Sequence, residues 1–441
     1  RGLRRPLPGG GGMRLVLVVP RFPRLSETFI VSKFVGLTDA GWDVHVVCAE
    51  TEAWTAFPAL MARPHLRRRV HRQWPHAATW QAALLWLPAL LLTLLRAPRA
   101  TLRYWRQALR GGLRRAARDF YLDAAIIALS PDILHFEFGA LAAGRTALKP
   151  RLGCRLTVSF RGYDLNYVGL DDPGHYAVVW RDADAIHTLG GDLWRRARRR
   201  GCPADKPHAL IPPAVDAEVF RPAARDAATI GPARPLRILS VGRLEWKKGY
   251  EHGLDAVRLL KARGVPVHYR ILGGGQYLEA LAFARHQLGL AAEVEFLGAH
   301  PPAEVPAQMQ WADVLLHPAV SEGFGNAVLE AQAMALPVVC SDADGLAENV
   351  ADGVSGFVAP RREPAALATA LARLAADPAL RAQMGAAGRE RVRREFRPTE
   401  QIAAFDRFYR DVLAGVRAGD PQPAANEARA ANPHQSESHA H

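Results

Sequence analysis

The sequence predicts an α/β protein with two doubly wound, Rossmann-like domains that face a central cleft. Short apolar runs alternate with helical patterns, which is typical of a parallel sheet with crossover helices. The alternation occurs in two series, separated by a proline- and alanine-rich stretch over residues 211–235. The length of 441 residues is sufficient for two or three domains, and a composition of 49% hydrophobic and 23% charged residues excludes a mostly disordered chain.

The apolar runs are the expected strands of the two sheets. In the first half they cover residues 13–20, 42–49, 132–136, 155–160, 185–189 and 208–211. In the second half they cover residues 236–241, 268–272, 294–297, 314–317 and 337–340. Ligands of such folds bind at the carboxyl ends of the strands, so we expect the functional residues directly after these runs.

The two series also predict the organisation of the chain. We expect an N-terminal domain over residues 13–215, a C-terminal domain over 216–398, and a helix over 399–417 that packs back toward the first domain. Residues 1–12 and the polar tail 418–441 are expected to be disordered. Residues 1–12 lack the apolar segment of a signal peptide, and Met13 is a candidate for the true start.

The charge is unevenly distributed. The net charge is +14, and all of the excess falls within residues 1–220, whereas residues 221–441 are balanced. A basic half favours an anionic partner, which is a nucleic acid, a membrane surface or an acidic substrate. The four cysteines stand far apart, so neither a zinc ribbon nor a redox dithiol is expected.

A helical, basic insert over about residues 76–120 interrupts the first series. Residues 82–95 are mostly apolar but too short to span a membrane, and they contain Pro88. In the segment that follows, arginines recur at steps of three or four residues. This spacing predicts one amphipathic helix over 96–118, of the type that lies on an anionic membrane. An ordinary surface helix is the alternative. The basic stripe consists of Arg96, Arg99, Arg103, Arg106, Arg110 and Arg114.

Three turns that contain glycine follow strands in the second half. The first carries Gly242 with Arg243 and Lys248, two cations that suit a diphosphate. The second starts at Gly273 and is equally compatible with a simple turn. The third, over residues 321–330, leads into a helix whose free N–H groups would favour phosphate.

The third turn holds two carboxylates, Glu322 and Glu330, which could accept hydrogen bonds from sugar and ribose hydroxyls. The alternatives are a solvated loop charge for Glu322 and an acidic residue favoured near a helix N-terminus for Glu330. Between them lie Gly323, Phe324, Gly325 and Asn326. The occurrence of all three turns in order on one predicted sheet favours a binding site over these alternatives.

These features resemble the family-four retaining glycosyltransferases of GT-B fold. The resemblance rests on the Glu322–Glu330 spacing, the turn over 242–249, and the runs 335–339 and 352–358, and it covers about residues 13–415. Two departures are Ala335, where the family often has glycine, and Asp344, which with Gly345 replaces a frequent glycine pair.

The resemblance implies a nucleotide-sugar donor held mainly by the C-terminal domain. Arg243 and Lys248 would bind its diphosphate, and Glu330 its ribose. Glu322 and the backbone of residues 323–326 would hold the transferred sugar. Gly242 and Gly273 would belong to the same donor-binding site.

Residues 23–29 resemble the P-x-x-SETF segment of family members that build exopolysaccharides, notably those of the colanic-acid type. This places Ser26, Glu27 and Thr28 on the acceptor side. The alternative is that Ser26 only caps the helix that starts at Phe29 and Ile30.

Two further strand ends of the first half carry candidate residues. His135 resembles the family histidine near the transferred sugar, although a structural hydrogen-bond partner is the alternative. Arg161 replaces a commoner histidine and would hold a phosphate of the donor or of a lipid diphosphate acceptor. Asp164 would be a polar contact in the cleft; a general base and a structural turn residue are both open roles. The candidate catalytic residues are therefore His135, Asp164 and Glu322.

The predicted function is that of a retaining, metal-independent glycosyltransferase, which extends a surface polysaccharide or a lipid-linked glycan. We expect no cofactor, because His, Asp and Glu do not fall in a ligand pattern. A front-face transfer is what the resemblance suggests, and the expected location is the inner face of the cytoplasmic membrane.

The alternatives on the same fold are a sugar-nucleotide epimerase and a donor hydrolase. A dinucleotide oxidoreductase is disfavoured because Gly9–Gly12 precede the first strand, whereas the fingerprint follows it. A nucleic-acid-binding protein is disfavoured because the clusters 67–69 and 195–200 form no recognition motif, so no nucleic acid is expected.

Overall fold

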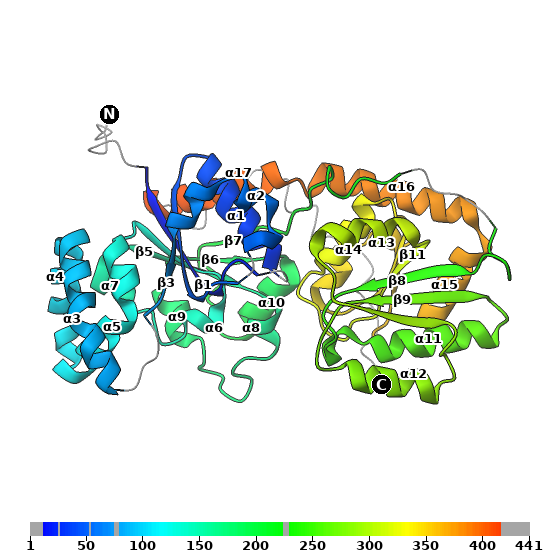
Figure 1. The fold of residues 1–441 in the computed structure, drawn as a ribbon, viewed down its shortest axis with the longest axis horizontal. Helices are drawn as coiled ribbons and strands as arrows, with labels where there is room; N and C mark the ends of the chain where they lie inside the picture. The colour runs from blue at the N-terminus through cyan, green and yellow to red at the C-terminus, as the bar shows by residue number, and fades with distance from the viewer. Residues whose placement is uncertain (1–11, 25–26, 53, 75–78, 224–228, 416–441) are drawn as a thin grey trace.

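The computed structural model describes residues 12–415, except 25–26, 53, 75–78 and 224–228. Two α/β domains lie side by side, each built on one parallel sheet (Figure 1). The prediction of two doubly wound domains is confirmed. Of the segments that we expected to be disordered, residues 1–11 and 418–441 lie outside the described residues.

The N-domain sheet has the order β3-β2-β1-β4-β5-β6-β7, and all of its strand pairs are parallel. The central strands are buried on both faces, which explains why they read as continuous apolar runs. The strands are β1 (Arg14–Arg21), β2 (Asp43–Glu50), β3 (Val70–Arg72), β4 (Ile133–Phe136), β5 (Arg155–Phe160), β6 (Ala185–Thr188) and β7 (His208–Leu210).

The helices of the N-domain cover this sheet on both faces. They are α1 (Thr28–Asp39), α2 (Pro58–Met61), α3 (Thr79–Arg96), α4 (Pro98–Ala108), α5 (Leu113–Leu129), α6 (Gly139–Ala142), α7 (Leu148–Leu152), α8 (Gly162–Asn166), α9 (Ala177–Asp182) and α10 (Gly191–Arg199). Among them, α3, α4 and α5 form the end of the molecule that lies away from the C-domain (Figure 1).

The C-domain sheet has the order β10-β9-β8-β11-β12-β13 and is also parallel. Its strands are β8 (Leu236–Val241), β9 (Val267–Leu272), β10 (Val294–Gly298), β11 (Val314–His317), β12 (Val338–Ser341) and β13 (Gly356–Ala359). Its helices are α11 (Tyr250–Ala262), α12 (Leu278–Gln287), α13 (Val305–Trp311), α14 (Asn326–Ala333), α15 (Pro364–Ala376) and α16 (Pro378–Glu395).

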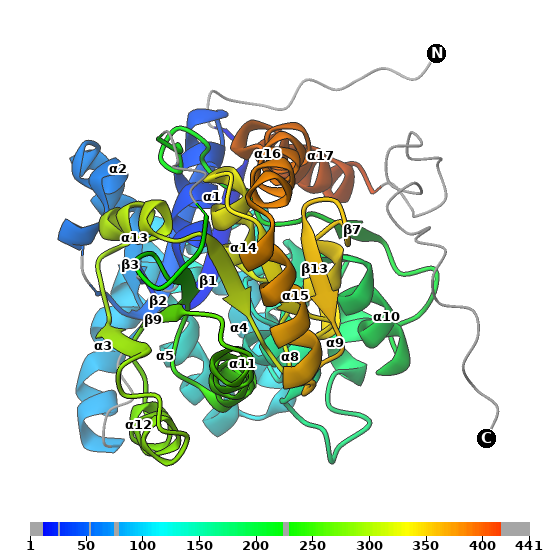
Figure 2. The same cartoon turned by 90° about the vertical axis from the view of Figure 1, so that its right-hand side faces the viewer.

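The last helix, α17 (Pro398–Ala414), returns to the N-domain and packs against α1. Helices α16 and α17 run along the same side of the molecule and join the two domains (Figure 2). Phe405, Phe408 and Tyr409 of α17 belong to the same buried cluster as β1 and β2. The N-domain core is therefore completed by the C-terminal part of the chain.

The prediction of one helix over residues 96–118 is wrong. Helix α3 ends at Arg96, Pro98 starts α4, and α5 begins only at Leu113. Gly112, with φ at +92°, separates α4 and its short 3-10 extension from α5. The arginines are consequently divided among three helices. Within the described residues, no helix is long and apolar enough to cross a membrane.

Among the described residues of the C-domain, Ala335, Asp344 and Arg362 hold a left-handed backbone without being glycine. Ala335, after α14, and Asp344, after β12, both have φ at +53°. A Cβ atom in this conformation lies too close to the backbone, at a cost of about 1–2 kcal/mol. Ala335 and Asp344 are the two positions at which the sequence departs from the glycines of the family that it resembles.

Replacing Ala335 by glycine should therefore stabilise the protein. The relief of strain exceeds the added entropy of the unfolded chain, so we expect the free energy of unfolding to rise by up to about 1 kcal/mol in denaturant titration. Ala331→Gly is the matched control, because Ala331 lies inside α14 and its replacement should destabilise by at least about 1 kcal/mol. Equal effects of the two changes would contradict this account.

Candidate active site

The loops at the carboxyl ends of the two sheets meet at the domain interface. Gly162 starts α8 of the N-domain, and Gly323 lies in the loop between β11 and α14 of the C-domain. A Cβ atom on Gly162 would lie 2.9 Å from the Cα atom of Gly323. The two backbones can approach this closely only because both residues are glycine.

Glu322 is held by three contacts within the C-domain. Its Oε2 atom accepts a hydrogen bond from Nζ of Lys248 and lies 3.1 Å from Nε2 of His317. Its Oε1 atom accepts one from the N–H group of Gly323 at 3.1 Å. Burial by itself raises the pKa of Glu322, but the charge of Lys248 and the hydrogen bond from His317 outweigh it and hold the pKa below its usual range. Glu322 is therefore an anion whose geometry is fixed.

The turn after β8 brings two cations to the same edge of the sheet. Lys248 contacts Glu322, whereas Arg243 pairs with Glu245 and keeps 48% of its side chain exposed. Gly242 and Gly273 allow two neighbouring turns to pack, because a Cβ atom on Gly273 would lie 1.9 Å from the carbonyl oxygen of Gly242. Lys248 is thus held in place, and Arg243 remains available to an anion.

The loop over residues 323–326 delivers the N-terminus of α14 to the interface. Gly325, with φ at +88°, is the N-cap residue, and Asn326 begins the helix. Phe324 anchors the loop, since its ring is buried at 6.0 Å from Phe396 and its carbonyl oxygen accepts a hydrogen bond from Asn349. The free N–H groups at this end of α14 favour an anionic group.

Glu330 lies on α14, and burial raises its pKa to about 7. No hydrogen bond or ion pair of its carboxyl group is found among the described residues. A half-buried carboxyl group without a partner in the described chain is able to accept hydrogen bonds from hydroxyl groups of a ligand.

The N-domain carries a buried ionic chain at the ends of β4 and β5. Glu137 accepts hydrogen bonds from Nζ of Lys33 and from Nη2 of Arg161, each at 2.7 Å. Burial raises the pKa of Glu137, but Lys33, His135 and Arg161 outweigh it and lower the pKa below its usual range. Arg161 is also stacked on the ring of Phe29, 4.0 Å from its centroid. Its guanidinium group is therefore locked in one orientation.

His135 and Asp164 are both fully buried, whereas their predicted roles require contact with a ligand. His135 is bonded to Thr157, at 2.8 Å, and to Ser159, at 2.9 Å, and it lies 3.2 Å from Nζ of Lys33. Asp164 accepts hydrogen bonds from the N–H groups of Ala140 and Arg161, each at 2.9 Å. The contacts of Asp164 are thus those of a structural turn residue, and His135 contacts Lys33, the partner of Glu137. The catalytic roles of both residues stay predictions.

The segment around Glu27 lies next to these cations. Ser26 lies outside the described residues; α1 begins at Thr28, and its N-cap residue is Glu27, which makes no capping hydrogen bond. Glu27 Oε1 accepts a hydrogen bond from Arg24, and Oε2 is buried without a partner in the described chain. Burial raises the pKa of Glu27, while the charges of Arg24, Arg161 and Arg243 oppose the rise. Arg243 of the C-domain thus acts on a carboxylate of the N-domain.

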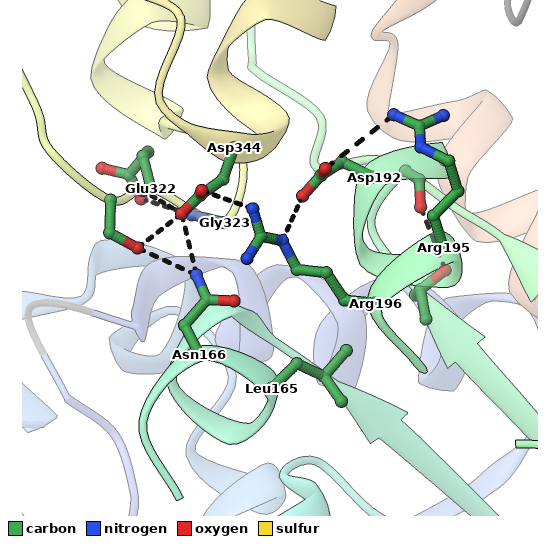
Figure 3. A network of polar contacts seen from close by, with 12 residues as sticks. Leu165, Asn166, Asp192, Arg195, Arg196, Glu322, Gly323 and Asp344 are labelled. Carbon is green, nitrogen blue, oxygen red and sulfur yellow. Dashed lines mark hydrogen bonds and ion pairs between the residues drawn. The ribbon is translucent and has the colours of Figure 1, made fainter. Parts of the chain in front are cut away.

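Further hydrogen bonds join the two domains around Gly162 and Gly323. The N–H groups of Gly191 and Asp192, at the start of α10, donate to the carboxylate of Glu348 at 3.0 and 2.6 Å. Asn166 of α8 donates to Ser321 and Asp344, each at 2.9 Å (Figure 3). The loop of the C-domain that carries Glu322 is therefore hydrogen-bonded to the N-domain.

Sequence reasoning missed several residues of this site. Lys33 and Asn166 lie far along the chain from their partners, so no local pattern indicates them. His317 ends a predicted strand only five residues before Glu322, so it carried a local signal. Glu137 did carry a signal, because it follows the strand end at His135 by two residues. Among the described residues, no group of three or more His, Cys, Asp or Glu side chains is placed to hold a metal ion.

Comparisons with known proteins identify the class to which this arrangement belongs. Residues 227–391 match the family described as "Glycosyl transferases group 1". The chain is 30% identical over 402 residues to the amylovoran biosynthesis glycosyltransferase AmsK of Erwinia amylovora, covering 87% of this chain and 96% of that protein. It is 31% identical over 401 residues to the putative colanic acid biosynthesis glycosyltransferase WcaL of Escherichia coli, covering 82% of this chain and 90% of that protein.

Solved structures agree with this assignment at the level of the fold. The structure of HepE from Anabaena in complex with UDP and glucose superposes with a TM-score of 0.66 at 16% identity, over 90% of this chain and all of that one. Sucrose-phosphate synthase from Thermosynechococcus elongatus gives a TM-score of 0.63 at 18% identity, over 91% and 99% of the two chains. The fold is that of a GT-B glycosyltransferase, and the chain belongs to the group 1 glycosyltransferase family.

The raised pKa of Glu330 makes the stability of the protein depend on pH. Between pH 4.5 and about 7 the unfolded chain loses a proton that the folded protein retains, so this group lowers the stability as the pH rises through that interval. Glu330→Gln removes the contribution. We expect the difference in melting temperature, variant minus unmodified protein, to increase from pH 5 to pH 8, as measured by differential scanning calorimetry. A constant difference would show that Glu330 titrates normally.

Proposed function

We propose that the protein transfers a sugar from a nucleotide-sugar donor to a growing surface polysaccharide or lipid-linked glycan, with retention and without a metal ion. The observation that carries this proposal is the Lys248–Glu322–His317 cluster beside the N-terminus of α14. It combines a cation, helix N–H groups and a fixed carboxylate, which suit a diphosphate and a sugar at adjacent positions.

In the proposed donor site, Arg243 and Lys248 neutralise the diphosphate together with the free N–H groups of α14. Glu322 and the backbone of residues 323–326 bind hydroxyl groups of the transferred sugar. Glu330 accepts hydrogen bonds from the ribose, which would lower its pKa on binding. The complex of HepE with UDP and glucose makes UDP a suitable first nucleotide to test.

The proposed chemistry is a front-face substitution. The bond between the anomeric carbon and the diphosphate oxygen breaks, and the acceptor oxygen bonds to the same face of the sugar. The proton of the acceptor hydroxyl passes to the leaving diphosphate. The cations stabilise the charge that develops on the diphosphate, so no divalent ion is required.

The acceptor side of the proposed site is formed by Glu27, Thr28 and Arg161. The unpartnered Oε2 atom of Glu27 can accept a hydrogen bond from an acceptor hydroxyl, and the locked guanidinium of Arg161 can bind a phosphate. His135 acts by positioning, because Lys33 connects it to the carboxylate that orients Arg161. The names of AmsK and WcaL support an exopolysaccharide as the product.

We also propose that the protein works at the inner face of the cytoplasmic membrane and docks through the helices α3, α4 and α5. Residues 53–118 contain thirteen arginines and no acidic residue. Leucines next to them are exposed, with Leu84 at 68%, Leu95 at 83% and Leu102 at 72% of their surface. The stripe on α3 consists of Leu84, Leu87, Leu91, Leu94 and Leu95. Exposed leucines flanked by arginines suit the interface of an anionic bilayer.

Lys248→Ala and Glu322→Ala should each abolish sugar transfer. The first removes a cation from the leaving diphosphate, and the second removes the carboxylate that binds the sugar. Transfer would be measured with purified protein, a panel of nucleotide sugars and membrane extract, with circular dichroism to confirm folding. Lys261→Ala is the matched control, because Lys261 pairs with Glu293 on the same domain away from these loops. Near-normal turnover in either site variant would overturn the donor-site assignment, and release of free sugar alone would favour a hydrolase.

Loss of the basic charges should release the protein from membranes. Each basic residue near an anionic surface contributes about 1 kcal/mol, so replacing four arginines by Gln should weaken co-sedimentation with phosphatidylglycerol vesicles at least about a hundredfold. The four are Arg99, Arg103, Arg106 and Arg110. Leu84→Gln with Leu91→Gln should weaken binding further, whereas the exposed Leu278 and Phe283 of α12 provide a control pair for replacement in the C-domain. Unchanged co-sedimentation of the arginine variant would refute docking.

A further inference from the structure

Asp344 collects more polar contacts at the domain interface than its position after β12 requires. Its side chain is 3% exposed. Within the described chain, one oxygen accepts hydrogen bonds from Ser321, Asn166 and the N–H group of Glu322, and the other from Arg196 and Arg361. All five partners are donors, so the carboxylate is satisfied on both oxygens. Figure 3 shows Asn166 and Arg196 directed toward it.

These donors come from different parts of the molecule. Ser321 and Glu322 belong to the loop between β11 and α14, at the proposed donor site. Asn166 lies on α8 and Arg196 on α10, both in the N-domain. The amide nitrogen of Asn166 lies 2.9 Å from Ser321 Oγ as well as 2.9 Å from Asp344. The carboxylate therefore links the donor loop to the N-domain directly.

We propose that Asp344 is a positioning residue that couples the donor loop to domain closure. This inference rests on the proposed function of the loop that carries Glu322. When the domains are closed, Asn166 and Arg196 complete the shell of Asp344 and fix Ser321 and the backbone of Glu322. When they separate, these two donors leave with the N-domain, and the loop loses its bond to Asn166. Because coupling between two equilibria is reciprocal, a nucleotide that needs the fixed loop favours closure, and closure raises its affinity.

The strained backbone of Asp344 is consistent with a role that glycine cannot fill. The left-handed φ of +53° favours glycine on steric grounds, yet a glycine at this position would leave all five donors without their acceptor. Asparagine is no substitute either, since its NH2 group would face hydrogen-bond donors. The contacts thus require a carboxylate at a position where the backbone favours glycine.

The test compares Asp344→Gly with Asn166→Ala and with the double variant. Hydrogen bonds to a charged group correspond to roughly a tenfold to hundredfold change in an equilibrium constant. We expect each single variant to weaken binding of UDP or GDP, measured by calorimetry, about tenfold, and the double variant to be no weaker than Asp344→Gly. Ala335→Gly is the matched control, because it relieves the same backbone conformation away from the interface and should leave the affinity unchanged.

Small-angle X-ray scattering provides the second measurement, without nucleotide. Asp344→Gly and Asn166→Ala should each increase the radius of gyration relative to the unmodified protein and to Ala335→Gly. Equal radii in all four proteins would overturn the proposal, and so would an unchanged affinity of Asn166→Ala. If neither UDP nor GDP binds to the unmodified protein, the proposed donors fail, and the scattering comparison still decides whether Asp344 controls closure.

Discussion

A carboxylate can be buried at the domain interface only if cations or several hydrogen-bond donors compensate its lost hydration. Glu137, Glu322 and Asp344 each satisfy this requirement in a different way. Glu137 uses Lys33 and Arg161 within the N-domain, and Glu322 uses Lys248 within the C-domain. Asp344 is compensated by arginines from both domains. The buried carboxylates Glu137 and Glu322 are thus each neutralised within one domain. Asp344, at the contact between the domains, is neutralised by arginines of both.

This distribution of charge separates what is rigid from what can move. The ionic chain of Glu137 is enclosed by β4, β5, α1 and α17, so the orientation of Arg161 does not depend on the C-domain. Lys248 and Glu322 likewise meet within one domain. The contacts of Asn166, Arg196 and Glu348 cross the interface, as does the ring contact of Tyr167 with Trp246, and contacts of this kind must break when the domains separate. Closure therefore brings together two prearranged surfaces.

The sequence was sufficient for the positions of most strands, because buried parallel strands read as apolar runs whatever surrounds them. It predicted neither β3 and β13 nor the order of the strands in the sheets. It also placed Lys248 and Glu322 in the same site, although not in contact, since 74 residues separate them. The burial of His135 was not predictable from its strand, because the ring of Tyr409 on α17 covers it at 5.5 Å. The break in the basic helix did have a local signal in Pro98 and Gly112, which a periodicity of three or four residues does not take into account.

The return of α17 to the N-domain has a consequence for synthesis of the chain. The strands and helices of the C-domain are contiguous in sequence, so that domain can complete its core as soon as α16 has been made. The N-domain is translated first but lacks the cover that Phe405 and Tyr409 provide. At roughly 10 residues per second, the ribosome needs on the order of half a minute to proceed from α1 to α17. During that interval the apolar face of α1 lacks its partner helix, so the nascent N-domain exposes apolar surface of the kind that favours aggregation.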